Sequence, residues 1–172
     1  MDKLILVDYN NQEIGSEEKM YVHQKGLLHR AFSIFIFNKN HELLIQQRAH
    51  IKYHSGGKWT NTCCSHPLLG ENQQEAVEQR LWYEMGVYCH LDWLFDLYYY
   101  SVLDNNMIEH EYDQIYIGYC DKEPLINHKE VSAYAWKNIT SLKNDIAKYP
   151  DDYTYWFKVI LLQIESYMKT FR

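Results

Sequence analysis

The order of apolar and polar residues along the chain predicts a series of β-strands. Apolar or alternating runs are bounded by turn-forming residues, as at Asn38–His41, and this is typical of strands joined by hairpins. A loop at Ser55–Gly57 precedes the stretch Trp59–Cys64, and strand character returns from Val87. The other predicted strands are Lys3–Val7, Ala31–Phe37, Glu42–Gln47, Trp93–Val102, Gln114–Tyr119 and Ala133–Trp136.

The sequence also predicts two helices. The first runs from Gln73 to Met85, because Asn72 is a suitable N-cap with Glu75 three residues later, and Gly86 is a typical helix stop. The second covers about residues 152–170, where apolar residues recur with i, i+3, i+4 spacing at Tyr153, Trp156, Phe157, Ile160, Leu161, Ile164 and Met168. The element order predicts a single α/β (α+β) domain over residues 1–172, with a mixed β-sheet sandwiched between helices.

Composition narrows the class of protein. Of 172 residues, 47% are hydrophobic and the net charge is −6, which is typical neither of a disordered chain nor of a nucleic-acid-binding surface. No apolar run reaches the roughly 18 residues that span a bilayer, and the N-terminal stretch lacks a signal-peptide pattern. We therefore expect a cytoplasmic protein that binds neither membranes nor nucleic acid.

The stretch Asn61–Pro67, NTCCSHP, holds two of the four cysteines next to a histidine. Adjacent cysteines form only a strained disulfide, and structural zinc sites usually space their cysteines by roughly two to four residues. If residues 61–66 are extended, Cys64 and His66 share one face with Thr62, whereas Cys63 faces the other way. Either cysteine alone is typical of a small buried apolar residue, but the face shared with His66 favours a functional role for Cys64.

Histidines and glutamates spread along the chain can form a metal site. Alternation puts Glu109 and Glu111 on one face of a strand and His110 on the other, and two such close carboxylates repel unless a cation separates them. Glu84 lies on the apolar stripe of the predicted helix and needs a partner there. Taken alone, such residues are equally typical of a solvated edge. A mixed N/O site for Zn, Mn, Fe or Mg forms if the fold also gathers His23, His29 and His66.

Basic residues lie at several separate positions. Arg48 and Lys52 are four residues apart, Arg80 is on the predicted helix, and Lys19 lies upstream. Scattered basic residues usually solvate a surface. Gathered in one pocket, these four can bind a diphosphate, with arginine as a bidentate donor and lysine as a point charge.

Four stretches, KGLLHRAFS, LLIQQRA, WTNTCCSHP and IEHE, resemble the type 1 isopentenyl-diphosphate isomerases. The resemblance runs over essentially the whole chain, from Lys19 to Trp156. It implies a fold similar to that of the Nudix hydrolases. One loop departs from the family pattern, because Ser55-Gly56 stands where many relatives carry Pro-Gly.

The predicted first helix resembles a degenerate Nudix box. The hydrolase pattern is R-E-U-x-E-E-x-G-U, with U aliphatic, and this chain has QRLWYEMGV at the same nine positions, after Glu71. Gln79, Arg80 and Tyr83 replace the arginine and two of the glutamates, so that only Glu84 remains. Their loss argues against the metal cluster that hydrolyses diphosphates.

The resemblance implies roles for individual residues. It makes Cys64 and Glu111 the catalytic pair, with Tyr99 assisting Glu111 and Trp156 lying over the C5 hydrocarbon of the substrate. The diphosphate would be bound by Lys19, Arg48, Lys52, Ser65 and Arg80. One divalent metal, Mn²⁺, Mg²⁺ or Zn²⁺, would have the ligands His23, His29, His66, Glu109 and Glu111. Glu84 would contact a Mg²⁺ that also touches the diphosphate.

The implied reaction is the interconversion of isopentenyl and dimethylallyl diphosphate in isoprenoid biosynthesis, by protonation and deprotonation and without a flavin. The C-terminal helix would close the site against water. The expected partner is a small diphosphate substrate, bound by a monomer or homodimer. The residues leave two alternatives open: a Nudix hydrolase of a nucleoside diphosphate derivative, and a small zinc-binding interaction module that uses Cys63, Cys64 and His66.

Overall fold

The computed structural model describes residues 2–170 of the chain, with side chains as far as Tyr167. The strands are β1 Lys3–Val7, β2 Glu13–Glu18, β3 His29–Phe37, β4 Leu43–Arg48, β5 Trp59–Thr60, β6 Cys63–Ser65, β7 Leu91–Val102, β8 Ile108–Tyr119 and β9 Val131–Lys137. The helices are α1 Lys19–Lys25, α2 Gln73–Met85, α3 Ile139–Lys148 and α4 Tyr155–Thr170, with short 3₁₀ turns η1 Asp104–Asn106 and η2 Pro150–Asp152.

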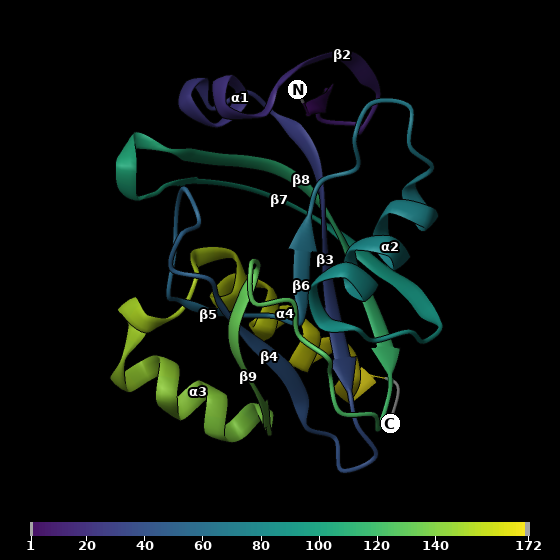
Figure 1. The fold of residues 1–172 in the computed structure, drawn as a ribbon, viewed down its shortest axis with the longest axis vertical. Coiled ribbons are helices and arrows are strands. Elements are labelled where there is room, and N and C mark those ends of the chain that lie inside the picture. Colours follow the sequence, from purple (N-terminus) through teal and green to yellow (C-terminus); the bar gives the residue numbers. More distant parts are fainter. Residues whose placement is uncertain (1, 171–172) are drawn as a thin grey trace.

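The strands form one mixed sheet with β3 at its centre (Figure 1). β3 pairs in parallel with β8 and antiparallel with β1, β4 and β6. β7 pairs antiparallel with β8, and β9 pairs antiparallel with β4. This confirms the predicted mixed sheet of an α+β fold.

Helices cover both faces of the sheet, α2 on one face and α4 on the other (Figure 1). Alternate side chains of β3 point to opposite faces because a strand repeats every two residues. Phe32, Ile34 and Ile36 pack in the cluster that includes the buried face of α2. Phe35 and Phe37 pack in the cluster that includes the buried face of α4. Both faces of β3 are therefore apolar, as expected of a central strand.

The predicted boundaries of α2 are confirmed, because both ends are set by local chemistry. The Asn72 side chain accepts hydrogen bonds from the backbone N–H groups of Gln74 and Glu75. Gly86 follows the last turn with a left-handed φ of 62°, and its N–H bonds to the Trp82 carbonyl. An N-cap of this kind stabilises a helix by about 1 kcal/mol.

The second predicted helix begins later than its apolar pattern indicates. α4 starts at Tyr155, because Pro150–Asp152 forms a separate 3₁₀ turn and Tyr153 is extended in a bridge with Trp59. The side chain of Met168, the last residue of the predicted stripe, lies outside the described part of the chain. Strand β7 begins at Leu91, two residues before the predicted Trp93, and the strand character expected from Val87 does not appear at residues 87–90. Within residues 2–170, no helix is long and apolar enough to cross a membrane.

Three elements of the structure were not predicted from the sequence. β2 is exposed or half-buried along its whole length and is held by its pairing with β1. α1 has seven residues and buries only Val22 and His23. α3 buries only Leu142. β2 and α1 bury too few residues to show a period. α3 has Ile139, Leu142 and Ile146 at helical spacing against the core, and the sequence analysis missed this pattern.

Thr62 corrects the prediction for the cysteine stretch. We expected its side chain on the same face as Cys64, but only residues 63–65 form a strand. The Thr62 hydroxyl accepts a bond of 2.9 Å from the Ile36 N–H and donates one of 2.6 Å to the Leu44 carbonyl. β3 and β4 diverge after their pairing at Phe37 and Leu43, and Thr62 satisfies backbone groups in the gap.

Candidate active site

Five side chains of metal-ligating types converge at one end of the central strands. The parallel ladder between β3 and β8 pairs His29 with Glu111, and alternation along β8 puts Glu109 on the same face. α1 contributes His23, and the residue after β6 is His66. One ligand atom from each of the five lies within 4.8 Å of all the others. We call these five residues the His/Glu group.

Backbone carbonyls orient two of these imidazoles. Nδ1 of His23 lies 2.7 Å from the Lys19 carbonyl oxygen, and Nδ1 of His29 lies 2.8 Å from the Leu27 carbonyl oxygen. Because a carbonyl only accepts hydrogen bonds, each Nδ1 carries the proton and each Nε2 keeps its lone pair. This is the arrangement in which a neutral histidine binds a metal through Nε2.

Unpartnered atoms in the His/Glu group indicate what it can hold. Among the described residues, His29 Nε2 and Glu109 Oε2 are buried without a hydrogen-bond partner, and so is His66 Nδ1. Such an atom costs about 1–3 kcal/mol when it is left unsatisfied. A divalent cation would satisfy the first two, and three imidazoles with two carboxylates are a donor set that Zn, Mn, Fe or Mg accepts. The residues present therefore fit a divalent metal.

The two carboxylates of the group have different environments. Burial raises the pKa of Glu109, but the neighbouring imidazoles of His23 and His54 outweigh it and hold this pKa well below its usual value. Burial and the neighbouring Glu109 both raise the pKa of Glu111 well above its usual value. The Tyr99 hydroxyl donates a 2.5 Å hydrogen bond to Glu111, and His66 Nε2 lies 2.9 Å from its other oxygen. The pocket therefore favours an ionised Glu109 and a protonated Glu111.

The two adjacent cysteines face opposite sides of the sheet, as the alternation predicted. Cys63 is buried in the cluster with α2, whereas Cys64 lines the pocket next to the His/Glu group. Arg48 Nη1 lies 3.9 Å from Cys64 Sγ. Burial raises the pKa of the Cys64 thiol to about 12, and the charge of Arg48 opposes that rise. The ligand-free pocket therefore holds Cys64 as a thiol.

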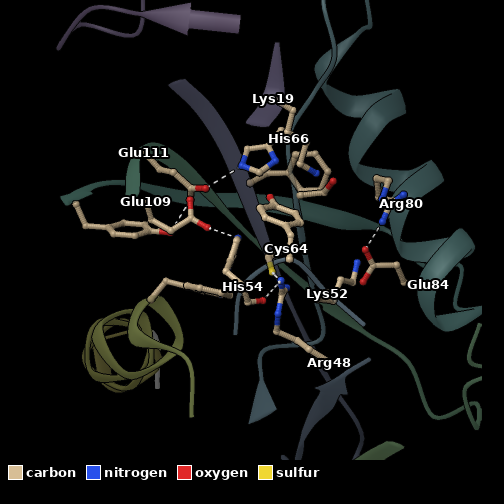
Figure 2. A pocket seen from close by; sticks show the side chains of 15 residues that line it. Lys19, Arg48, Lys52, His54, Cys64, His66, Arg80, Glu84, Glu109 and Glu111 are labelled. Atoms are coloured by element: carbon tan, nitrogen blue, oxygen red, sulfur yellow. Dashed lines mark hydrogen bonds and ion pairs between the residues drawn. The ribbon is translucent and has the colours of Figure 1, made fainter. Parts of the chain in front are cut away.

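Basic side chains gather at the end of the pocket opposite the carboxylates. Figure 2 shows Glu109 and Glu111 at one end, Arg80 with Glu84 at the other, and Cys64 between them. Lys19, Lys52 and Arg80 line the pocket here, and so does Ser65. Burial lowers the pKa of Lys19, and repulsion from Lys52 and Arg80 lowers it further. Cations packed this closely favour an anionic ligand.

Two acidic residues lie among these cations. Glu84 is buried on α2 and bonds Arg80, and its other oxygen accepts a 2.9 Å bond from Gln46. The Glu130 carboxylate forms an ion pair with Lys52 and lies 3.7 Å from Arg80. The sequence predicted a partner for Glu84, but it gave no signal for Gln46 or Glu130. Both come from other strands or loops of the chain.

Trp156 closes one side of the pocket. It lies in the first turns of α4, is 3% exposed, and packs in the core cluster under that helix. The Arg48 guanidinium is 5.4 Å from the centre of its ring. The ring quadrupole of a tryptophan that lines a pocket favours a positive charge in that pocket.

His54 is a pocket residue that the sequence did not single out. It is 3% exposed, and its Nε2 lies 2.9 Å from Glu109 Oε1. Its ring centre is 6.0 Å from that of Trp156. The residue belongs to the loop whose Ser55-Gly56 sequence departs from the family pattern, and that departure was the only local signal.

Comparison with known families and structures identifies the fold. The NUDIX domain family matches residues 27–157 of the chain. A crystal structure of a protein from Deinococcus radiodurans is similar with a TM-score of 0.72 and 17% identity, covering 86% of this chain and 90% of that one. A MutT protein from Methanosarcina mazei is similar with a TM-score of 0.69 and 15% identity, covering 83% and 96%. At these identities the likeness shows the fold alone.

Relatives found by sequence are identical to this chain at many more positions. It is 51% identical to isopentenyl-diphosphate Delta-isomerase 2 of Photorhabdus laumondii, over 92% of this chain and 89% of the relative. It is 44% identical to isopentenyl-diphosphate Delta-isomerase of Pectobacterium atrosepticum, over 100% of this chain and 96% of the relative. The enzyme of Serratia proteamaculans with the same name is 44% identical over 93% and 89%.

Proposed function

The chain belongs to the isopentenyl-diphosphate Delta-isomerases of the Nudix fold, and from this premise we propose that Cys64 and Glu111 transfer the protons of that isomerisation. The enzyme interconverts isopentenyl and dimethylallyl diphosphate. The observation that carries our assignment is that both side chains line one pocket together with Trp156 and the basic cluster.

The chemistry requires a strong acid in a dry site. An unactivated alkene is a very weak base, so its protonation needs a carboxyl group that is held neutral at low dielectric. Glu111, with its raised pKa and its bond from Tyr99, has this character. We assign it to protonate the terminal CH₂ carbon of isopentenyl diphosphate, which moves the positive charge to the tertiary carbon C3.

Loss of a proton from C2 completes the reaction. Cys64 Sγ, as a thiolate, takes this proton, the C2–H electron pair becomes the new double bond, and Glu111 is left ionised. The reverse direction exchanges these roles. The thiol must therefore lose its proton to solvent before turnover, and the charge of Arg48 at 3.9 Å favours the ionised form. After turnover Cys64 again returns its proton to solvent, and Glu111 takes one up.

Trp156 and the basic cluster supply binding and orientation. The indole ring would stabilise the C3 cation by about 2 kcal/mol if the site is desolvated. The diphosphate would be held by Lys19, Arg48, Lys52, Ser65 and Arg80. Binding energy at this end, remote from the alkene, orients C4 and C2 between the two proton-transfer groups. We assign α4, which carries Trp156, to exclude water that would quench the cation. In this proposal residues 1–172 form one domain.

Two divalent ions belong to the proposal. We assign Mn²⁺, Mg²⁺ or Zn²⁺ to the His/Glu group, whose buried atoms fit a cation. When bound, this ion supplies positive charge that offsets the repulsion between Glu109 and Glu111. We assign Mg²⁺, bound with the diphosphate, to Glu84, and its charge would replace that of Arg80 as the partner of this carboxylate.

Incubation in D₂O tests the reaction class. The purified protein with Mg²⁺ and isopentenyl diphosphate should give deuterium-labelled dimethylallyl diphosphate, because the proton added to C4 comes from an exchangeable group. Unlabelled substrate together with released phosphate would overturn the proposal in favour of a Nudix hydrolase. The replacements at Gln79 and Tyr83 argue against that outcome, because they remove ligands of the hydrolase pattern.

A further inference from the structure

The Glu109 carboxylate uses its two oxygens differently. Oε1 lies 2.9 Å from His54 Nε2. Oε2 lies 3.4 Å from His23 Nε2 and is buried without a hydrogen-bond partner among the described residues. Figure 2 shows both histidines on the pocket side of the carboxylates, with His54 reaching Glu109 from the side of Arg48 and His66 reaching Glu111 from the side of Lys19. Oε1 is thus bonded by His54, which is outside the His/Glu group, whereas Oε2 faces the other members of that group.

The ring of His54 is fixed by the loop that carries it. The Ser55 N–H donates a 3.0 Å bond to the Asp104 carboxylate, and the Asn105 amide donates a 3.0 Å bond to the Tyr53 carbonyl. Asp104 and Asn105 form the turn that joins β7 to β8. The loop with His54 is therefore tied to the turn that leads into the strand of Glu109, so both partners of the contact are held by one substructure.

Ser55 shows why this loop needs such anchors. Its φ of 50° is left-handed, which a residue other than glycine adopts at some cost. The bond from its N–H to Asp104 holds this conformation, and the Arg48 guanidinium donates a 3.3 Å bond to the His54 carbonyl. The side chain of His54 is consequently directed inward, where it is 3% exposed, and away from solvent.

We propose that His54 is a positioning residue for the metal site: its Nε2–H holds Glu109 Oε1, so that Glu109 binds the ion through Oε2 alone. This inference rests on the metal site of the proposed function. A carboxylate binds divalent ions through one or both oxygens, and a donor on one oxygen removes that choice. Partners of this kind, one shell outside the ligands, typically change metal affinity by about 10–100-fold when they are removed.

His54 lies outside the ligand set itself. The five residues whose ligand atoms lie within 4.8 Å of one another do not include it. Its Nε2 points at a carboxylate oxygen, which accepts hydrogen bonds only, so that nitrogen carries a proton and has no lone pair for a metal. The role we assign is therefore to hold a ligand and not to be one.

Calorimetric titration of metal-stripped protein with Mn²⁺, without substrate, tests this role. We expect His54→Ala to weaken Mn²⁺ binding by about 10–100-fold. His54→Gln should restore affinity close to wild type, because the glutamine amide reaches the position of Nε2 and still donates. His50→Ala is the matched control, since His50 is an exposed histidine at the start of the same loop, and its affinity should be unchanged.

Two results would overturn the proposal. Wild-type Mn²⁺ affinity in His54→Ala would show that Glu109 needs no positioning. Equal weakening in His54→Ala and His54→Gln would show that His54 is itself a ligand. Circular dichroism checks folding, and if the alanine variant does not fold, weakened Mn²⁺ binding in a folded His54→Gln still overturns the proposal. No substrate is present in this titration, so a failure of isomerisation in D₂O would not affect its result. Likewise, a failure of the His54 proposal would leave the test of isomerisation unaffected.

Discussion

The Tyr99 hydroxyl donates a 2.5 Å hydrogen bond to Glu111 Oε2, with both side chains buried in the pocket. The ladder between β7 and β8 pairs these two residues directly, so the contact follows from the register of the two strands. Among the contacts of Glu111, this one opposes burial and the charge of Glu109, because it lowers the carboxyl pKa. It therefore tunes the group that we assign as the acid.

Tyr99→Phe should slow the reaction without preventing binding. Loss of the bond raises the pKa of Glu111 further, which makes it a weaker acid towards the alkene. A hydrogen bond to a charged group is worth about 1.5–3 kcal/mol, so kcat should fall by about 10–100-fold. KM for isopentenyl diphosphate should stay near wild type, because the basic cluster is unchanged. Steady-state kinetics would contradict this role if KM rose and kcat did not fall.

Cys64→Ala and Cys63→Ala form a matched pair. Removing a general base typically costs about 10²–10⁴ in rate, so Cys64→Ala should abolish most isomerisation. Cys63→Ala should keep most of it, because this side chain packs under α2 and only a small core contact is lost. Isomerisation rates and melting temperatures of both variants measure the difference. Equal loss of activity in the two variants would contradict different roles for Cys63 and Cys64 on opposite faces of the strand.

Alkylation of Cys64 should be slow and steeply dependent on pH. Its pKa is raised to about 12, and only the thiolate reacts, so below this pKa the thiolate fraction rises tenfold for each pH unit. In metal-stripped, substrate-free Cys63→Ala protein, the iodoacetamide rate should rise without a plateau from about pH 7 to 9.5. At pH 8 the alkylation rate of Cys64 in the folded protein should be about 10³-fold lower than in the protein unfolded in urea. Mass spectrometry of the Cys64 peptide measures both, and a plateau below pH 9 would refute the raised pKa.

Removal of metal should destabilise the fold. The His/Glu group then keeps buried atoms of His29 and Glu109 without partners. An ion present at 100 times its dissociation constant adds about 2.7 kcal/mol to the free energy of unfolding. This corresponds to a rise of about 5–10 °C in melting temperature for a chain of this size. Calorimetric scans with Mn²⁺ and with EDTA measure this difference. In a His29→Ala control, most of this metal-dependent shift in melting temperature should disappear. A shift equal to that of the wild type would place the ion elsewhere.

Elements set by neighbouring residues could be predicted. The start and end of α2 follow from Asn72 and Gly86, whose interactions reach only a few residues along the chain. The opposite facing of Cys63 and Cys64 follows from strand period alone. α4 was predicted in kind but with a start about three residues early, because the apolar pattern of residues 152–154 belongs to a 3₁₀ turn and a strand bridge.

The amino-acid sequence by itself determined the sheet-and-helix architecture, the family resemblance and a set of candidate site residues. Each of these depends on residue type and on spacing within one segment. Only the tertiary structure decided which candidates meet, because His23, His66 and Glu109 come from different elements and converge through strand pairing. It alone revealed His54, since the 2.9 Å contact with Glu109 joins a loop and a strand 55 positions apart and leaves no periodic trace along the chain.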